Sequence, residues 1–192
     1  MSSRKGAWQT LETTTVYDNP WIRVEEHQVI NPSGGENLYG KVCFKNRAVA
    51  ILALDTDDQI YLVGQHRYTL NEYSWELPMG GAPLTEDLLE AAQRELKEET
   101  GLTAARWEQV MRLHLSNSIS DEIGVVYLAQ ELTQGQTEFE DTEDLSIKRL
   151  PFSEALDWVL EGRITDAPSA AGILGLWARR QRAPEESQGP SR

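Results

Sequence analysis

The sequence predicts an α+β protein in which helices pack on a mixed or antiparallel sheet. Short runs of β-forming residues, separated by turn signals, occupy residues 1–79 and 103–150. An amphipathic helix is expected at 85–100, and two further helices at 153–161 and 168–181. Both element types fall within 192 residues, a length that suits one ordinary domain with a small appendage.

The predicted elements divide the chain into an arm, a body and a tail. Residues 1–46 are expected to form a β-rich arm, with strands near 13–17, 22–30 and 39–44 and a turn at 31–35. Residues 47–182 form the body, whose apolar runs at 48–54 and 60–63 are separated by 55–59 in a hairpin pattern. Strands are also expected at 124–129 and 145–150, and the polar tail 183–192 is expected to be disordered.

Composition and charge exclude several classes of protein. The chain has 18 Lys and Arg against 31 Asp and Glu, a net charge of -13 that disfavours binding to nucleic acid. Its single cysteine, Cys43, excludes an internal disulfide framework and is expected to be a small core residue. No run approaches the roughly 20 apolar residues of a membrane-spanning helix, and the N-terminus lacks a secretory signal, so a cytoplasmic location is expected.

The predicted helix at 85–100 carries acidic residues where apolar ones are expected. Thr85 is a plausible N-cap, and Gly101 is a natural residue to follow the last turn. At about 100° per residue, Glu95, Glu98 and Glu99 share a face that overlaps the apolar stripe. Burying unpaired carboxylates is costly, whereas a divalent cation with oxygen ligands removes this conflict. The alternative is a solvated acidic helix stabilised by basic residues on the same helix.

Residues 80–102 resemble the Nudix box at every fixed position. The matching residues are Gly80, Glu86 and Arg94-Glu95-Leu96-Lys97-Glu98-Glu99-Thr100-Gly101-Leu102. The resemblance implies a Nudix α/β/α sandwich with a mixed sheet and Mg²⁺-dependent hydrolysis, with Mn²⁺ as the alternative metal. It assigns as metal ligands Glu95, Glu98, Glu99 and the backbone carbonyl of Met79, while Arg94 and Glu86 orient the acidic face. Glu98 is also assigned a catalytic role.

Further segments resemble the branch of this family that hydrolyses ADP-ribose and nucleotide sugars. They are residues 19–24, 62–68, 73–81 and 161–167. The resemblance implies a homodimer formed through the N-terminal strands, in which the partner helps to line the nucleotide site. Arg67 is the best candidate for a phosphate contact, and Lys41 and Arg47 are weaker ones. Trp21 is expected to stack on the base or to lie in the dimer core.

Two segments after the box bear on specificity and catalysis. The branch often has Pro and Gly where this chain has Asn117 and Ser118, which predicts a weaker preference for ADP-ribose. The acid of that motif is retained, so Glu122 is expected to bind substrate. The resemblance also assigns the acidic run 138–144 to catalysis, with Glu143 as a metal ligand and Asp141 or Glu140 as the base. Without the resemblance, a solvated loop is the better interpretation of this run.

The sequence as a whole predicts an enzyme that cleaves the pyrophosphate bond of a nucleoside diphosphate sugar. The expected products are a nucleoside monophosphate and a sugar phosphate. One alternative is a Nudix hydrolase of a dinucleotide polyphosphate or a nucleoside triphosphate. The other is a non-catalytic nucleotide-sugar sensor, although sensors typically lack the box carboxylates that this chain retains.

Overall fold

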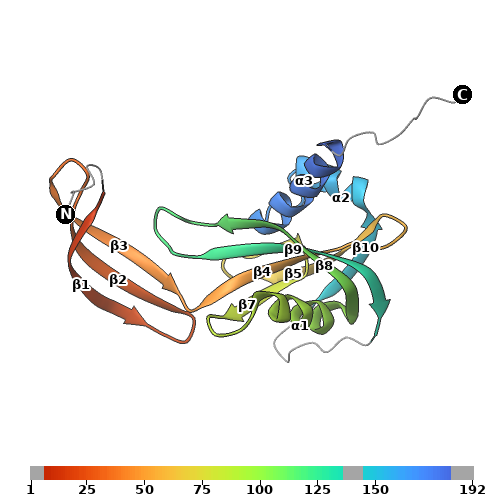
Figure 1. Ribbon diagram of the computed structural model, residues 1–192, viewed down its shortest axis with the longest axis horizontal. Helices are drawn as coiled ribbons and strands as arrows, with labels where there is room; N and C mark the ends of the chain where they lie inside the picture. Colours follow the sequence, from red (N-terminus) through yellow and green to blue (C-terminus); the bar gives the residue numbers. More distant parts are fainter. Residues whose placement is uncertain (1–6, 136–144, 183–192) are drawn as a thin grey trace, which may run out of the picture.

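The computed structural model describes residues 7–135 and 145–182 as a three-stranded arm that extends from a layered body (Figure 1). The α+β class expected from the sequence is confirmed. The arm consists of β1 (Gln9–Asp18), β2 (Ile22–Ile30) and β3 (Glu36–Phe44). The elements of the body are β4 (Asn46–Ala53), β5 (Gln59–Arg67), β6 (Glu72–Glu76), β7 (Met79–Pro83), α1 (Leu88–Thr100), β8 (Leu102–His114), β9 (Ile123–Gln134), β10 (Ser146–Pro151), α2 (Phe152–Leu160) and α3 (Ala167–Arg182).

The arm is an antiparallel sheet in the order β1-β2-β3, and every residue of β1 is exposed. The loop between β8 and β9 holds the base of the arm against the body. Val42 donates its backbone N–H to the carbonyl of Ile119 at 2.8 Å, and Lys41 pairs with Asp121 at 2.8 Å. Cys43 is buried in β3, as the sequence suggested.

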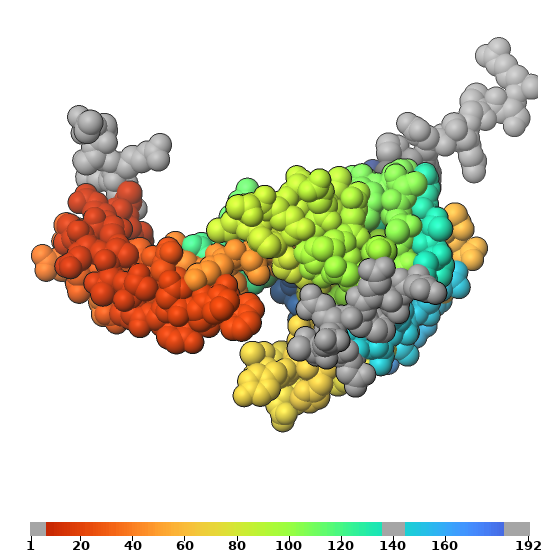
Figure 2. Space-filling view, turned by 90° about the horizontal axis from the view of Figure 1, so that it is seen from below, coloured from red at the N-terminus to blue at the C-terminus, as the bar shows by residue number. Residues whose placement is uncertain are grey.

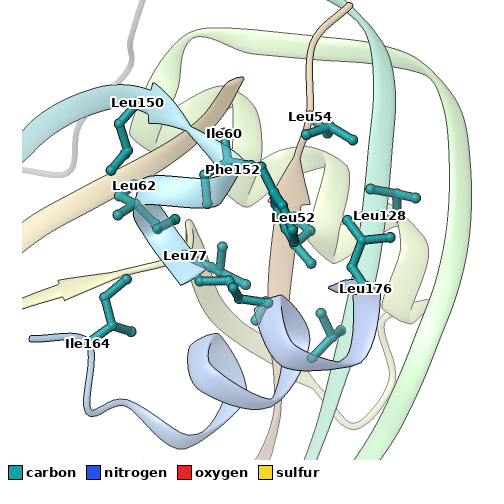
Figure 3. Packing of buried hydrophobic residues seen from close by; sticks show 14 of the residues in the cluster. Leu52, Leu54, Ile60, Leu62, Leu77, Leu128, Leu150, Phe152, Ile164 and Leu176 are labelled. Atoms are coloured by element: carbon teal, nitrogen blue, oxygen red, sulfur yellow. The ribbon is translucent and has the colours of Figure 1, made fainter. Parts of the chain in front are cut away.

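The body contains two sheets, which together produce the layers of the fold. The mixed sheet has the order β7-β4-β9-β8, with β4 and β9 parallel and the other neighbours antiparallel. The second sheet, β10-β5-β6, is antiparallel. A hydrophobic core lies on each face of the mixed sheet, and alternate residues of β4 belong to different cores. Val49 and Ile51 pack toward α1, whereas Leu52 packs toward α2, α3 and the second sheet (Figure 3). Among the described residues, α1 is the helix that covers this face of the mixed sheet.

The hairpin expected around residues 55–59 forms only as a local turn. Asp55 donates its backbone N–H to the carbonyl of Gln59 at 3.0 Å, and Leu54 and Ile60 form a single bridge. Beyond that bridge β4 and β5 diverge into different sheets. Both strands are apolar on two faces, because each is covered by other elements on both sides.

Helix α1 begins two residues later than the sequence suggested. Its N-cap is Asp87 and not Thr85, since the Asp87 carboxylate accepts the backbone N–H groups of Leu89 and Glu90 at 2.8 and 3.2 Å. The helix ends at Gly101, which has a φ of 70° and donates to the carbonyl of Lys97. None of the helices in the described residues is long and apolar enough to cross a membrane.

Candidate active site

A polar cleft of about 470 Å³ lies where α1 faces β7 and the base of the arm. We call it the main cleft. It brings together six residues predicted from the sequence: Trp21, Arg67, Met79, Glu95, Glu98 and Glu99. The cleft is also lined by Asn46, Gln65, Gly80, Gly81, Pro83 and Arg94. Residues far apart in the sequence therefore meet at the acidic face of α1.

The acidic face of α1 lies directly against the backbone of β7. Glu99 is only 2% exposed, and its carboxylate accepts the backbone N–H of Met79 at 2.9 Å. A Cβ atom on Gly80 would lie 2.1 Å from the carboxyl carbon of Glu95, so only glycine fits there without displacing that side chain. The strand β7 reaches this position because it pairs with β4, with Gly80 opposite Val49. Two box carboxylates thus approach the main chain of the strand closely.

Arg94 links the carboxylates of the box to one another. Its Nη1 donates to Glu95 at 2.8 Å and to Glu98 at 2.9 Å. Its Nη2 donates to the carbonyl of Gly81 at 3.1 Å, and Nε donates to Glu86 at 3.3 Å. The hydrogen bond to Glu86 is the largest cause that raises the pKa of the Arg94 guanidinium above its ordinary value. Arg94 and Glu86 are therefore placed to orient the acidic face.

The donor groups of the main cleft suit a hard divalent cation. The carboxylates of Glu95, Glu98 and Glu99 line the same cleft as Met79, and oxygen ligands are those that Mg²⁺ and Mn²⁺ prefer. Within residues 7–135 and 145–182, no three acidic, histidine or cysteine side chains already converge on one point as a metal site does. Arg94 Nη1 bridges the carboxylates of Glu95 and Glu98. The donor groups fit a divalent metal, and the guanidinium of Arg94 holds Glu95 and Glu98 in place.

Arg67 lies at the edge of the main cleft and is held by a buried partner. Its Nε donates to one oxygen of Glu76 at 2.9 Å, and its Nη2 donates to the other oxygen, so the ion pair is bidentate. The Glu76 side chain is 3% exposed, whereas that of Arg67 is 36% exposed. Glu76 is the main cause that raises the pKa of Arg67 above its ordinary value. The guanidinium therefore stays charged and is fixed with part of its surface toward solvent.

Trp21 enters the main cleft from the arm with 67% of its surface exposed. Its backbone is fixed on both sides, because Trp21 donates its N–H to Asn19 and accepts the N–H of Lys45, both at 2.9 Å. A large exposed ring on a fixed backbone is suited to stacking on a planar group. Its position also leaves open a contact with a second copy of the chain.

Other predicted site residues lie away from the main cleft. Lys41 pairs with Asp121 on the arm, and Glu122 lies in a shallow depression formed by the loop between β8 and β9. Arg47 donates to the backbone carbonyls of Pro83 and Glu86. The structure of one chain does not bring these three residues to the carboxylates of α1. The predicted catalytic and metal residues Asp141, Glu140 and Glu143 lie outside the described residues, as does the predicted tail at 183–192.

Sequence reasoning assigned no role to three residues that belong to this region. Asn46 and Gln65 line the main cleft, and Glu76 holds Arg67. Glu76 had one signal in the sequence, because an acidic residue inside an apolar stretch needs a charged or hydrogen-bonded partner. Asn46 and Gln65 carried no such signal, because polar residues at strand ends are common.

Two family models together match most of the chain. The NUDIX domain matches residues 44–171, and the nucleoside diphosphate sugar hydrolase N-terminal domain matches residues 8–42. The first includes β7, α1 and both sheets of the body, and the second includes the three strands of the arm. The junction between the two matches falls where β3 passes into β4.

Several characterised proteins resemble the chain over most of its length. An ADP-ribose pyrophosphatase of Mycobacterium tuberculosis is 34% identical, with 89% of this chain and 84% of the relative covered. An ADP-ribose pyrophosphatase of Bacillus subtilis is 33% identical over 67% of this chain and 71% of its own length. A methanol dehydrogenase activator of Bacillus methanolicus is 26% identical over 88% and 91%. The crystal structure of an ADP compounds hydrolase shares the fold, with a TM-score of 0.82, 23% identity, and 94% of this chain and 99% of that chain covered.

Proposed function

The chain belongs to the Nudix family and is a pyrophosphohydrolase, and we propose that it cleaves the diphosphate of a nucleoside diphosphate sugar, ADP-ribose or a related compound. One observation carries the proposal. The main cleft joins the carboxylates of Glu95, Glu98 and Glu99 to a fixed, charged Arg67 and an exposed Trp21. These groups correspond to the parts of such a substrate: a metal-bound diphosphate, a phosphate oxygen and a base.

We propose that Glu95, Glu98, Glu99 and the carbonyl of Met79 hold a divalent cation, Mg²⁺ in the cell. When bound, the cation supplies positive charge that offsets the acidic cleft and polarises the phosphate oxygens. Glu99 is positioned for this role by the N–H of Met79, and Glu95 by the close approach of Gly80. Arg94 restrains Glu98 and Glu95 and thereby keeps both carboxylates facing the cleft.

The remaining residues of the main cleft bind and orient the substrate. Arg67 donates to a phosphate oxygen from the part of its guanidinium that Glu76 leaves exposed. Trp21 stacks on the base, in the same chain or across a dimer. Asp141 or Glu140 acts as the general base, with Glu143 as a further metal ligand, which is an assignment from the sequence. Replacing Asp141 by Asn and Glu140 by Gln separates these two candidates.

We also propose that the chain acts as a homodimer formed through the arm. Support comes from large apolar side chains that are more than half exposed on the arm of one chain: Trp8, Leu11, Val16, Tyr17, Trp21 and Leu38. Lys41 and Glu122 lie on the arm and on the loop beside it, so a second copy would bring them toward its own cleft. The predicted contact of Lys41 with substrate depends on this arrangement.

A substrate panel tests the proposed function. The purified chain is assayed with Mg²⁺ and with a chelator, and phosphate release is coupled to a phosphatase that acts only on the products. The panel contains ADP-ribose, ADP-glucose, GDP-mannose, UDP-glucose, a dinucleotide polyphosphate and ATP. We expect metal-dependent hydrolysis of the nucleotide sugars, with ADP-ribose favoured by less than about a hundredfold in kcat/KM, or nearly 3 kcal/mol. Binding without hydrolysis would indicate a sensor, and a preference for ATP or the dinucleotide would indicate the other alternative.

A further inference from the structure

A second, smaller cleft opens beside the main cleft. It measures about 300 Å³, at the lower end of the range for ligand pockets, and we call it the side cleft. The β5–β6 hairpin contributes Arg67, Thr69, Leu70, Ser74 and Glu76 to its lining, and the segment that enters α3 contributes Thr165 and Asp166. Arg67 lines both clefts, so they meet at this guanidinium. A ligand bound at Arg67 can therefore extend into the main cleft on one side and into the side cleft on the other.

The polar groups of the side cleft match a chain of hydroxyl groups. Within the described residues, the hydrogen bonds of the Asp166 side chain go to its Oδ2 atom, which accepts the N–H and O–H of Ser169 at 2.9 and 2.7 Å. This leaves the Oδ1 atom of Asp166 as an acceptor. The hydroxyls of Thr69, Ser74 and Thr165 make no hydrogen bond to the described protein side chains or backbone, and each can both donate and accept. One carboxylate oxygen and three hydroxyls suit a sugar, whose hydroxyls also donate and accept.

Asp166 is rigidly placed for such a contact. Ser169, which donates to it, is fully buried and accepts the backbone N–H of Leu77 at 2.9 Å. This chain of hydrogen bonds connects the start of α3 to the segment that leads into β7. The carboxylate is therefore fixed relative to the strand that lies against Glu95 and Glu99.

The charges around the side cleft disfavour an anionic ligand. Asp166 interacts with Glu76 and with Glu122, and Arg67 is the cation that offsets them. Burial is the main cause that raises the pKa of both Asp166 and Glu122 above their ordinary values. Glu76, Asp166 and the substrate phosphate that Arg67 binds together exceed the single positive charge of Arg67, so a further phosphate or carboxylate in this cleft would face net negative charge.

We propose that the side cleft binds the uncharged terminal sugar of the substrate and excludes substrates that end in a phosphate. This inference rests on the proposed function and extends it to the choice of substrate. Ser74, Thr165 and Asp166 contact the sugar hydroxyls, while Arg67 holds the phosphate that joins the sugar to the main cleft. The site thereby distinguishes a nucleotide sugar from a nucleoside triphosphate, although both present a diphosphate to the metal.

Two substrates that differ only in the terminal group test this inference. One is ADP-ribose, and the other is the monomethyl ester of ADP, which keeps the nucleoside and the diphosphate but lacks the sugar. We expect the double variant Ser74→Ala/Thr165→Val to lower kcat/KM for ADP-ribose by about tenfold, the effect of losing one or two hydrogen bonds. The kcat/KM of this variant for the methyl ester is expected to stay within about twofold of wild type. The methyl ester has no sugar, so the two side-chain hydroxyls have nothing to bind in its transition state. Ser153→Ala, an exposed serine on α2, serves as the control for both substrates.

A second variant, Asp166→Asn, tests the effect of charge on the choice of substrate. Asp166→Asn keeps an acceptor for Ser169 and removes the negative charge, so the ratio of kcat/KM for ATP to that for ADP-ribose is expected to rise by about tenfold. An equal loss for both ADP compounds in the double variant, or no loss for either, overturns the inference while the proposed function stands. A wild-type chain that hydrolyses neither ADP compound overturns both. A methyl ester that remains a good substrate for each variant shows that the variant has folded.

Discussion

Single side chains in the main cleft are held by contacts that do not involve substrate. Arg94 donates to Glu95, Glu98 and Glu86, and Glu76 holds Arg67. Each cation thus neutralises buried acid and fixes it in one orientation. Such preorganisation is valuable because catalytic groups act best when they need not reorganise during the reaction. The carboxylates of Glu95 and Glu98 on α1 are therefore held in fixed orientations as well as close together.

Replacing Glu99 by Gln tests the role of the most buried carboxylate. The amide can still accept the N–H of Met79, so the fold is expected to remain intact. It is a much poorer ligand for a hard cation, and we expect kcat to fall by about a hundredfold or more at saturating Mg²⁺. Steady-state kinetics and thermal unfolding measure the two effects. Glu90→Gln, an exposed position on the same helix, is the control. Near-wild-type turnover of Glu99→Gln would refute the metal assignment.

The sequence allowed part of this site to be predicted, for a physical reason. Glu95, Glu98 and Glu99 are neighbours on a helix, and their relative directions follow from helical geometry alone. Arg67 and Trp21 were found through segments that resemble the family. By contrast, the contact between Glu76 and Arg67 depends on the pairing of β5 with β6, and Asn46 enters the cleft through the pairing of β4 with β7. Which strands pair is decided by the tertiary structure, and the sequence around each strand gives no local signal for its partner.

At the scale of the elements, the strands were less predictable than the helices. The three helices follow clear apolar periodicity, and the arm and the two central strands follow apolar runs. Strands β6 and β7 are short, and β7 contains two glycines and a proline, residues that usually argue against a strand. One of these glycines, Gly80, is required by the close approach of Glu95, and this contact overrides strand propensity. Strand β8 is long but largely exposed and polar, so it lacks the pattern of a buried strand.

The start of α1 offers a matched comparison between two possible caps. Asp87 accepts two backbone N–H groups of the first turn, whereas Thr85 lies before the helix. We therefore expect Asp87→Ala to lower the free energy of unfolding by about 1 kcal/mol. Thr85→Ala is expected to change it by less than about 0.5 kcal/mol. Denaturant unfolding measures both values. Equal losses, or a larger loss for Thr85→Ala, would contradict the assignment of the cap.

The arm contains a buried carboxylate that links its stability to pH. Glu25 accepts hydrogen bonds from Arg23 at 2.7 Å, from His27 at 3.0 Å and from the Cys43 thiol at 3.3 Å. These bonds, that of His27 first, lower the pKa of Glu25 from 4.5 to about 2. The ionised form is therefore favoured by folding. Its contribution to stability is complete above pH 4.5 and is lost as the pH falls toward 2.

Glu25→Gln tests this linkage. The difference in the free energy of unfolding between wild type and Glu25→Gln is expected to be largest at neutral pH and to narrow as the pH falls below 4.5. Comparing the two proteins at each pH cancels the acid groups that they share. Glu26→Gln, an exposed neighbour on the same strand, should show no such narrowing. A constant difference for Glu25→Gln across this pH range would mean that the carboxylate is not stabilised by folding.

At the scale of the whole molecule, the arm is the feature that one chain does not explain. It extends from the body and presents an open sheet to solvent, as Figures 1 and 2 show. Figure 2 also shows the molecule hollowed between the arm and the protruding turn that joins β5 to β6. Strand β1 is an exposed edge strand, and proteins normally cover such edges. The arm also carries several aromatic and aliphatic side chains that are about half exposed. The net charge of -13 acts against nonspecific association, so a specific self-complementary contact is required.

A homodimer satisfies this requirement, because a two-fold contact covers the same surface on both copies. Light scattering at micromolar concentration is expected to give twice the 21.7 kDa mass of the chain. The double variant Leu11→Arg/Leu38→Arg places charge on the exposed apolar surface of the arm and should shift the chain to a monomer. Leu160→Arg, at a leucine of α2 that is 70% exposed, is the control and should remain dimeric. If the partner helps to line the nucleotide site, the monomeric variant should also lose activity at low concentration, and raising its concentration should restore it. A wild-type monomer at micromolar concentration would refute the dimer, and Lys41, which pairs with Asp121 on the arm, would then have no route to the main cleft.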